Sequence, residues 1–449
     1  KKWLIENNIT FSRFDSYHHH LAHAASASLP SPFHDGLCLT IDGRGDYESS
    51  CLYKFNRSKH TPLEKIVSFT SADSLGYFYG RITGLLGFKP MRHEGKITGL
   101  AALGNPQKAI GLMREMISFK DGHLEASLGD LYRPFFAPYN KELVERVNDF
   151  KKEDIAAAAQ LHLEELVTSL VKFYIEKDRK NANVMLAGGV FGNVKLTQAI
   201  KNLECVNRVF VQPQMGDGGL CIGAAALSQH ENGNRIKPII DMFLGPRTFA
   251  IKDNLPQNVG FKTIVEFEEQ IQEIIKDLSH NNVIGIVRGR MEFGPRALCN
   301  RSIICQTSDK TINDSINKRL ERTEFMPFAP VIRLERCKDA FIKFDNDDQT
   351  LKYMTSTVDC TELFNKNSPA VCHVDKTARP QVINKEENLF MWNLLKSWEE
   401  FSNELCLVNT SFNAHEEPII NTCQEALNAL TNKRIDVLYV ENTRYFLHQ

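Results

Sequence analysis

The sequence predicts an α/β protein with two domains. Its 449 residues exceed what one hydrophobic core normally holds, since a domain averages about 150 residues. In the first half, a strand, a glycine turn and a helix follow one another twice, which is typical of nucleotide-binding sheets. A polar run at 230–238 then precedes a new pattern of strands and helices that starts at Phe261. We therefore place the boundary near residue 242, with domains 1–242 and 243–449.

The first half is interpreted from its apolar patterns. Residues 37–43 are expected to form a buried strand that ends in an aspartate and a glycine. Residues 155–175 carry apolar side chains at helical spacing and predict a long helix. The repeated unit comprises strands at 183–186 and 208–211, glycine turns at 188–189 and 216–219, and a helix at 221–227. Chemistry in such a sheet usually lies where its strands end.

The second half predicts a helix at 265–278 and a strand at 283–287 that leads into an arginine-rich segment. A further strand at 404–408 is followed by the polar sequence 409–413. These elements place polar side chains after strands in this domain as well.

Composition limits the classes of function. Apolar residues make up 42% and charged residues 24%, and the formal net charge is -1. This balance is typical of a globular enzyme and argues against nucleic-acid binding through bulk charge. No apolar run is long enough to cross a bilayer, and the eleven cysteines lack paired spacing. We expect a cytoplasmic protein without nucleic-acid or membrane partners, and the sequence is compatible with a homodimer.

The segment 288–301 contains four arginines and one acid. A guanidinium group binds phosphate or carboxylate oxygens two at a time, so this density predicts an anion site. The alternative is a set of surface ion pairs of little energetic value. Three apolar residues within the segment, Phe293, Ala297 and Leu298, favour attachment to a core over that alternative.

Histidines predict a metal site in the first half. His19 and His23 are four residues apart and lie on one face if the segment is helical. Asp42 and Asp217, each beside a glycine, could complete a set of two imidazoles and two carboxylates that suits iron(II), manganese or zinc. The alternative is that the histidines only make local hydrogen bonds at a helix start.

Glycines predict a phosphate contact. Gly188, Gly189 and Asn193 follow one strand, and Gly216 and Gly218 follow the next. Glycine allows backbone amides to approach a phosphate closely, although tight turns alone would also explain these residues.

Other donors are scattered. The charged sequence 92–96 is expected in a loop, either solvated or functional. Arg379, Ser411 and Asn413 add a guanidinium, a hydroxyl and an amide to Arg296 and Arg301, as a site for a triphosphate and a second small phosphate compound would need.

The order of these motifs resembles the NodU/CmcH family of O-carbamoyltransferases over nearly all of the chain. The motifs that carry the resemblance are HHLAH, IDGRGD, MGDGG, GRMEFGPRALCNRS, PFAP, TARPQ and NTSFN. The resemblance implies an amino-terminal domain of the ASKHA (actin/hexokinase-like) type without its first strands, followed by a YrdC-like α/β domain. The chain also opens in what looks like the middle of a helix, so we expect that residues precede Lys1.

The resemblance also implies a reaction and a site. The YrdC-like domain would condense ATP, with Mg²⁺, and carbamoyl phosphate into carbamoyl-adenylate, and the ASKHA-type domain would transfer the carbamoyl group to a hydroxyl of a small metabolite, sugar or glycan. Iron would be held by His19, His23, Asp42 and Asp217. The nucleotide end of that site would include Gly188, Gly189, Asn193, Gly216 and Gly218. The activation site would include Arg296, Arg301, Arg322, Arg379, Ser411 and Asn413.

Two positions depart from the family pattern. Leu320 and Met326 stand where the family often has lysine and arginine, and Arg322 is retained. Lys318 or Arg319 is expected to reach the same phosphates instead. The departures keep two alternatives open: a scaffold that binds metal and nucleotide without turnover, and a related enzyme that modifies tRNA or a protein.

Overall fold

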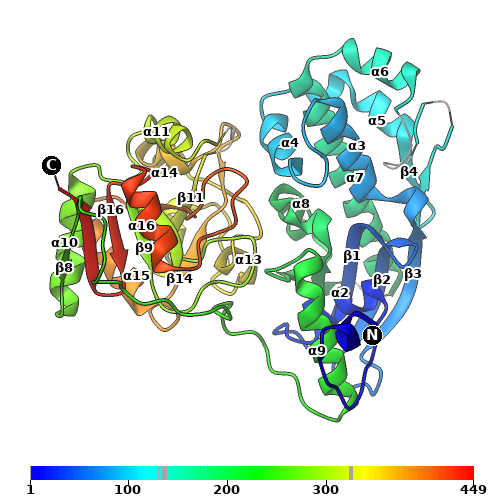
Figure 1. The fold of residues 1–449 in the computed structure, drawn as a ribbon. Helices are drawn as coiled ribbons and strands as arrows, with labels where there is room; N and C mark the ends of the chain where they lie inside the picture. The colour runs from blue at the N-terminus through cyan, green and yellow to red at the C-terminus, as the bar shows by residue number, and fades with distance from the viewer. Residues whose placement is uncertain (1, 130, 134–138, 179–180, 323–326, 449) are drawn as a thin grey trace.

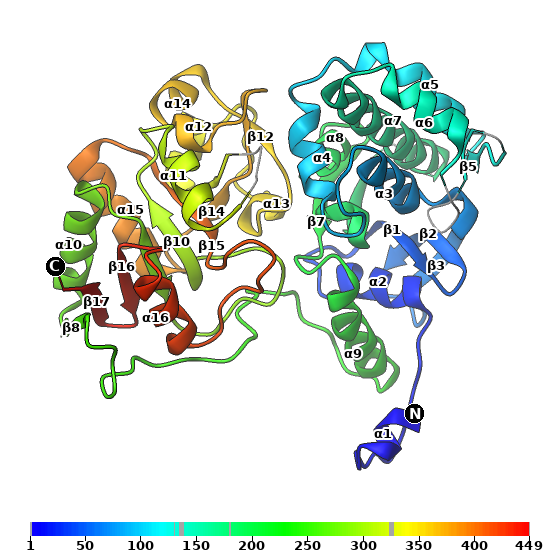
Figure 2. The ribbon, with the colours of Figure 1, turned by 45° about the horizontal axis from the view of Figure 1, so that its top comes forward.

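Two α/β lobes make up the computed structural model, which describes residues 2–129, 131–133, 139–178, 181–322 and 327–448. The first lobe contains a five-stranded sheet and the second an eight-stranded sheet. An extended linker after residue 231 runs from one lobe to the other (Figures 1 and 2). The predicted α/β class with two domains is confirmed, whereas the boundary at residue 242 stays a prediction.

The first sheet has the strand order β3-β2-β1-β6-β7. Its strands are β1 (Asp35–Gly45), β2 (Glu48–Asn56), β3 (Leu63–Thr70), β6 (Ala182–Ala187) and β7 (Val206–Val211). Strands β1, β6 and β7 are parallel, and β2 and β3 extend the sheet in antiparallel pairing. Because parallel strands end at the same edge of a sheet, the segments that follow β6 and β7 come close to the end of β1.

Alternate side chains of β1 pack on opposite faces of this sheet. Leu39 and Ile41 belong to the core that includes helices α3 (Leu75–Leu85) and α7 (Lys152–Asp178). Cys38 belongs to the core that includes α2 (His19–Ser28) and α9 (Leu220–Glu231). The period of two is what an extended strand buried on both faces requires. The first lobe also contains α1 (Lys2–Glu6), α4 (Glu94–Ala101), α5 (Ile110–Met116), β4 (Ile117–Lys120), β5 (His123–Ala126), α6 (Lys141–Asn148) and α8 (Val194–Lys201).

The second sheet has the order β14-β11-β15-β10-β9-β16-β17-β8. Its strands are β8 (Val259–Thr263), β9 (Ile284–Val287), β10 (Arg301–Cys305), β11 (Ala329–Arg333), β14 (Gln381–Ile383), β15 (Cys406–Ser411), β16 (Val437–Val440) and β17 (Thr443–Leu447). Helices α10 (Phe267–Ser279) and α15 (Leu389–Ser402) share one core with it. Helices α11 (Ile312–Arg319) and α16 (Cys423–Thr431) share another. The remaining elements are α12 (Cys337–Ala340), α13 (Gln349–Lys352), β12 (Val358–Asp359), α14 (Glu362–Asn367) and β13 (Thr377–Ala378).

The predicted elements are present, and two local predictions are wrong. Strand β15 runs on to Ser411, because β10 pairs with it as far as that residue. Part of the segment 409–413 therefore lies within a strand rather than after it. Residues 94–96 are not in a loop, because α4 begins at Glu94 and buries Lys96, which is 7% exposed. Met326, whose role is a prediction, lies outside the described residues.

Within the described ranges, no helix has both the length and the apolar character that a membrane crossing would need.

Candidate functional site

Four side chains with metal-ligand chemistry meet at one edge of the first sheet. They are His19 and His23 on α2, Asp42 in β1, and Asp217 in the 3-10 turn Asp217–Gly219 before α9. One ligand atom from each residue lies within 4.8 Å of all the others. The Nε2 atom of His23 lies 3.1 Å from Asp42 Oδ2 and 3.4 Å from Asp217 Oδ1. The structure thus brings together the four residues that the sequence grouped.

Close packing of α2 and α9 makes this convergence possible. An added Cβ at Gly223 of α9 would lie 1.8 Å from the carbonyl oxygen of Ala22 in α2, so only glycine lets the two backbones approach this closely. Ala22 lies next to His23, and Asp217 lies just before α9. The contact between the helices therefore sets the distance between the histidines and Asp217.

Burial and charge favour a cation at this cluster. Burial alone would lower the pKa of His23, but the carboxylates of Asp217 and Asp42 raise the pKa above its ordinary value. Burial opposes ionisation of Asp42, yet the neighbouring imidazoles of His19 and His23 hold its pKa well below the usual range. Among the described residues, the buried Nε2 of His19 has no hydrogen-bond partner. An orphaned imidazole nitrogen beside two carboxylates fits a divalent ion with nitrogen and oxygen ligands.

The neighbouring histidines do not join this set. The ring nitrogens of His20 lie 2.8 Å from Thr40 Oγ1 and 3.1 Å from the Glu48 carbonyl oxygen, and burial lowers the pKa of His20 to about 4. His18 Nε2 lies 3.4 Å from a Glu48 carboxylate oxygen. Sequence reasoning drew nothing from these two histidines, and the structure gives both of them other partners.

The glycine turn after β6 lies against the cluster. Gly188 has a φ of 101°, and the Gly189 N–H donates to Asp42 Oδ2 at 3.3 Å. Asn193 accepts from the Leu196 N–H as the cap of α8 and pairs with Gln160, so its side chain serves the fold first. The roles of Gly216 and Gly218 at a nucleotide stay predictions.

We predict that Gly188→Ala destabilises the first lobe by about 3 kcal/mol, because the new Cβ would be strained at positive φ and would meet backbone. The Cβ would lie 2.1 Å from the Ile41 carbonyl oxygen. Urea unfolding of the variant measures the loss. Gly192→Ala is the control, since its Cβ would meet no atom within 4 Å among the described residues. Equal unfolding midpoints for the two variants would contradict the steric role of Gly188.

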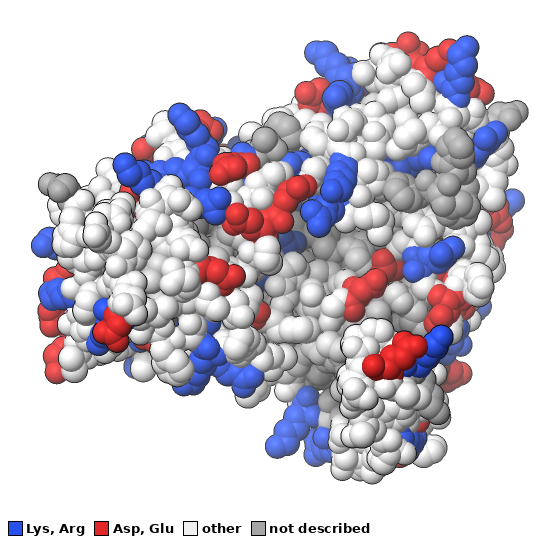
Figure 3. All heavy atoms as spheres, in the orientation of Figure 1, with Lys and Arg blue, Asp and Glu red and all other residues white. Residues whose placement is uncertain are grey.

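A cavity of about 510 Å³ lies between the lobes. Its wall in the second lobe includes Arg296, Arg322, Arg379, Ser411 and Asn413. The opposite wall is formed by the start of α4 and by Gly192. Figure 3 shows a hollow between the lobes with basic and acidic side chains along its edge. Five of the six residues predicted for the activation site therefore face one space.

Two guanidinium groups lie close together in this cavity. Arg296 donates from Nη2 to the Gly192 carbonyl oxygen at 3.1 Å, and its buried Nε has no partner among the described residues. Burial and then the like charge of Arg379 lower the pKa of Arg296 well below its ordinary value. Two neighbouring cations in a partly buried space repel each other, so they favour an anion that neutralises both.

Arg322 connects the strand β15 to the segment that follows it. Its guanidinium donates to Thr410 Oγ1, to the carbonyl and hydroxyl oxygens of Ser411, and to the carbonyl and amide oxygens of Asn413, at 2.8 to 3.1 Å. The arginine thereby fixes the hydroxyl and the amide at the cavity wall.

Three predicted or suggested donors lie elsewhere. Arg301 is fully buried and donates to three backbone carbonyl oxygens of its own segment and to that of Pro246, so it holds the loop between β9 and β10 and does not line the cavity. Lys318 is exposed on α11, and Arg319 pairs with Asp436 at 2.8 Å. Leu320 is 1% exposed in the core of the second lobe. Arg301, Lys318 and Arg319 therefore lie outside the wall of this cavity, and their contact with phosphates stays a prediction.

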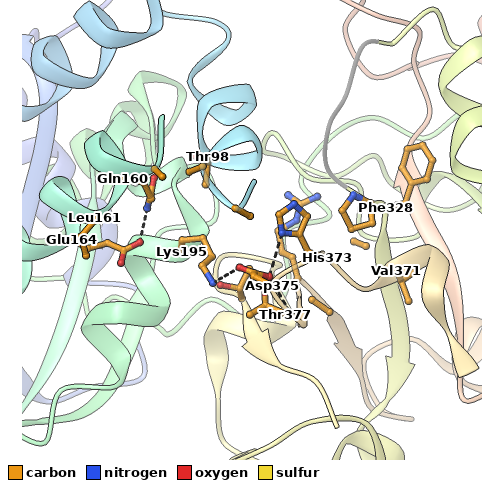
Figure 4. Close-up of a pocket in the computed structure, with 18 of the residues that line it drawn as sticks. Thr98, Gln160, Leu161, Glu164, Lys195, Phe328, Val371, His373, Asp375 and Thr377 are labelled. Carbon is orange, nitrogen blue, oxygen red and sulfur yellow. Dashed lines mark hydrogen bonds and ion pairs between the residues drawn. The ribbon is translucent and has the colours of Figure 1, made fainter. Parts of the chain in front are cut away.

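A smaller cavity of about 190 Å³ adjoins the first and shares Arg379 with it. Here Lys195 of the first lobe donates to Asp375 of the second at 2.9 Å, and His373 Nδ1 lies 3.2 Å from the same carboxylate (Figure 4). Burial opposes ionisation, but His373 and Lys195 lower the pKa of Asp375 well below its usual range. The sequence did not predict this group, because Lys195 and Asp375 are 180 residues apart and meet only where the lobes touch.

Comparisons with known proteins identify the family of the chain. Family models described as carbamoyltransferase N-terminus and carbamoyltransferase C-terminus match residues 6–226 and 275–446. An uncharacterized protein of Methanocaldococcus jannaschii is 33% identical over 98% of this chain and 84% of its own length. The nodulation protein NolNO of Sinorhizobium fredii is 30% identical, over 96% of this chain and 63% of that protein. The 3'-hydroxymethylcephem-O-carbamoyltransferase of Amycolatopsis lactamdurans is 27% identical, over 80% of this chain and 66% of that enzyme. The chain therefore belongs to the carbamoyltransferase family, and it is a transferase.

Proposed function

We propose that the chain is an ATP-dependent O-carbamoyltransferase that activates carbamoyl phosphate as carbamoyl-adenylate and passes the carbamoyl group to a hydroxyl. The observation that carries this proposal is the half-buried pair Arg296 and Arg379 in the cavity between the lobes. Carbamate, which remains when carbamoyl phosphate loses its phosphate, is a poor electrophile because its carbonyl has no good leaving group, and adenylation supplies one. Arginine stays protonated, so these residues position phosphates and neutralise charge rather than transfer protons.

The two lobes divide the work in this proposal. The first would be of the ASKHA type and the second YrdC-like, and ATP would bind with Mg²⁺ against the arginines. His19, His23, Asp42 and Asp217 would hold iron(II) or another divalent ion, which when bound supplies Lewis-acid stabilisation of developing negative charge. The Gly189 N–H, hydrogen-bonded to Asp42, keeps that carboxylate oriented toward the histidines.

The acceptor in this proposal is a hydroxyl of a small metabolite, sugar or glycan. The relative from Amycolatopsis lactamdurans is named for an O-carbamoyl transfer to a hydroxymethylcephem, which is a small molecule. We propose a cytoplasmic enzyme that needs neither nucleic acid nor membrane, and we propose a homodimer as its assembly.

Exchange of labelled pyrophosphate into ATP tests the activation step. In this scheme carbamoyl phosphate first loses its phosphate to water, and the carbamate that remains displaces pyrophosphate from ATP. We expect exchange that depends on carbamoyl phosphate, because this second step is reversible. Loss of label incorporation when carbamoyl phosphate is omitted is the control. Absence of exchange with both substrates present would overturn the proposal in favour of a scaffold that only binds nucleotide. A third outcome is that pyrophosphate exchange occurs but the carbamoyl group is transferred to tRNA or protein and not to hydroxylated small molecules. That result would favour an enzyme that modifies tRNA or a protein.

A further inference from the structure

The charged segment 92–96 of the first lobe faces the arginines of the second lobe. Among the described residues, the wall of the larger cavity includes Arg92 and Lys96, and Lys96 is its only lysine. In the part of this wall that the structure describes, the lysine and arginine side chains number five, against two glutamates. One of those glutamates, Glu417, pairs with Arg434 at 3.0 Å, outside the wall. The cavity is therefore strongly cationic, and part of its positive charge comes from the first lobe.

Lys96 is fixed in place by its local fold. It lies in the first turn of α4, and α4 packs along α7. The preceding turn is held by two hydrogen bonds: the Met91 N–H donates to Glu94 Oε1 at 2.6 Å, and the Lys89 N–H donates to His93 Nδ1 at 3.1 Å. A lysine that is 7% exposed loses hydration, and a partly buried ammonium stabilises an anion more than an exposed one does.

Contacts between the lobes close the cavity beside Lys96. Glu416 of the second lobe lies 3.8 Å from Arg92 and 3.7 Å from His93 Nε2, and the rings of His93 and His415 stack with centroids 6.1 Å apart. Glu416 has a φ of 61°, a conformation that non-glycine residues adopt rarely and often at functional sites. These contacts hold the start of α4 against the arginine wall.

The tautomer of His93 favours a contact with Glu416 over a metal ion at this edge of the cavity. His93, His415 and Glu416 have ligand atoms close enough to hold an ion. However, His93 Nδ1 accepts the Lys89 N–H, so in a neutral ring the proton is on Nε2, which faces Glu416. A metal on Nε2 would need the opposite tautomer. The tautomer thus supports a contact between the lobes rather than a second metal site.

We propose that Lys96 of the first lobe binds a phosphate group of the nucleotide, so that the activation site is shared by both lobes. This inference rests on the proposed function. Arg296, Arg322 and Arg379 of the second lobe would bind one side of the polyphosphate. Lys96 would contact the other side as a compact point charge. Arg92, which is exposed, contributes mainly by attracting the anion to the rim. One consequence is that nucleotide binding stabilises the contact between the lobes.

The test compares Lys96→Met with Lys89→Met in the full chain. Lys89 lies on the same segment but is exposed and does not line the cavity. For Lys96→Met we expect a rise of about 10- to 100-fold in the ATP KM of pyrophosphate exchange and in the Kd for inorganic pyrophosphate by calorimetry, the size of a lost charge-assisted hydrogen bond. Lys96→Arg should recover part of the affinity, and Lys89→Met should match the parent chain.

The outcomes separate this inference from the proposed function. Exchange by the parent chain with equal KM values for Lys96→Met and Lys89→Met would overturn the role of Lys96 and leave the function standing. No exchange by the parent chain would overturn the function, and pyrophosphate affinity would then test Lys96 directly. A lower kcat in Lys96→Met with unchanged KM and Kd would also count against phosphate binding. Unchanged thermal melting of Lys96→Met shows that the fold is intact.

Discussion

Arg296→Ala is expected to abolish carbamoyl-adenylate formation, with pyrophosphate exchange reduced by about 100- to 1,000-fold. The guanidinium is buried in the cavity beside Arg379, and it bridges the lobes through the Gly192 carbonyl oxygen. Its removal takes away both a bidentate phosphate donor and the contact that orients it. Arg296→Lys keeps the charge without the planar fork, so it should recover only a small part of the rate.

The measurement is labelled pyrophosphate exchange, together with metal content by elemental analysis. Arg290→Ala is the matched control, because Arg290 belongs to the same segment but donates to backbone carbonyl oxygens of residues 244 and 245 at the surface. Metal content should stay unchanged in both variants, since neither arginine is among the four candidate ligands. Loss of metal from Arg296→Ala would contradict the assignment of activation and metal binding to separate sites.

The metal cluster could be predicted from sequence because each part has a local signature. His19 and His23 have helical spacing, Asp42 lies near the end of a strand that the apolar pattern identifies, and Asp217 follows another. Parallel strands end at a common edge, so the fold class alone implies that such residues meet. The close approach of α2 and α9 could not be predicted, because Gly223 is one of many small residues in its helix.

The cavity between the lobes was predictable only in part. The high density of arginines identified the segment 288–301 as an anion site. Density alone does not distinguish a buried arginine that donates to backbone carbonyl oxygens from an arginine that lines a ligand cavity. Arg301 and Arg296 differ in this way. Lys96 and Lys195 of the first lobe reach the cavities between the lobes only because the two lobes pack against each other. Short-range sequence patterns do not encode how two separately folded lobes pack.

His23→Ala is expected to lower metal affinity by more than about 100-fold, since even residues behind the ligands change affinity by 10- to 100-fold. His23 contacts both carboxylates of the cluster. Its side chain is 1% exposed, so no side chain from the surface can take the place of the missing imidazole as a ligand. Carbamoyl transfer to the hydroxyl should be lost. Pyrophosphate exchange should persist, because His23 does not line the cavity of the arginines. Metal analysis and exchange are measured on the same preparation.

A second variant separates loss of a ligand from loss of folding. Asp217 has a side chain that is 72% exposed, so Asp217→Asn removes a carboxylate without opening the core. It should reproduce the loss of metal and of transfer that His23→Ala shows, whereas His18→Ala, outside the four-residue set, should change neither. If exchange falls in His23→Ala and Asp217→Asn as far as it does in Arg296→Ala, the two lobes do not divide activation from transfer. If exchange survives in both, the metal cluster acts after the adenylate has formed, because the only step that these variants then lack is transfer of the carbamoyl group.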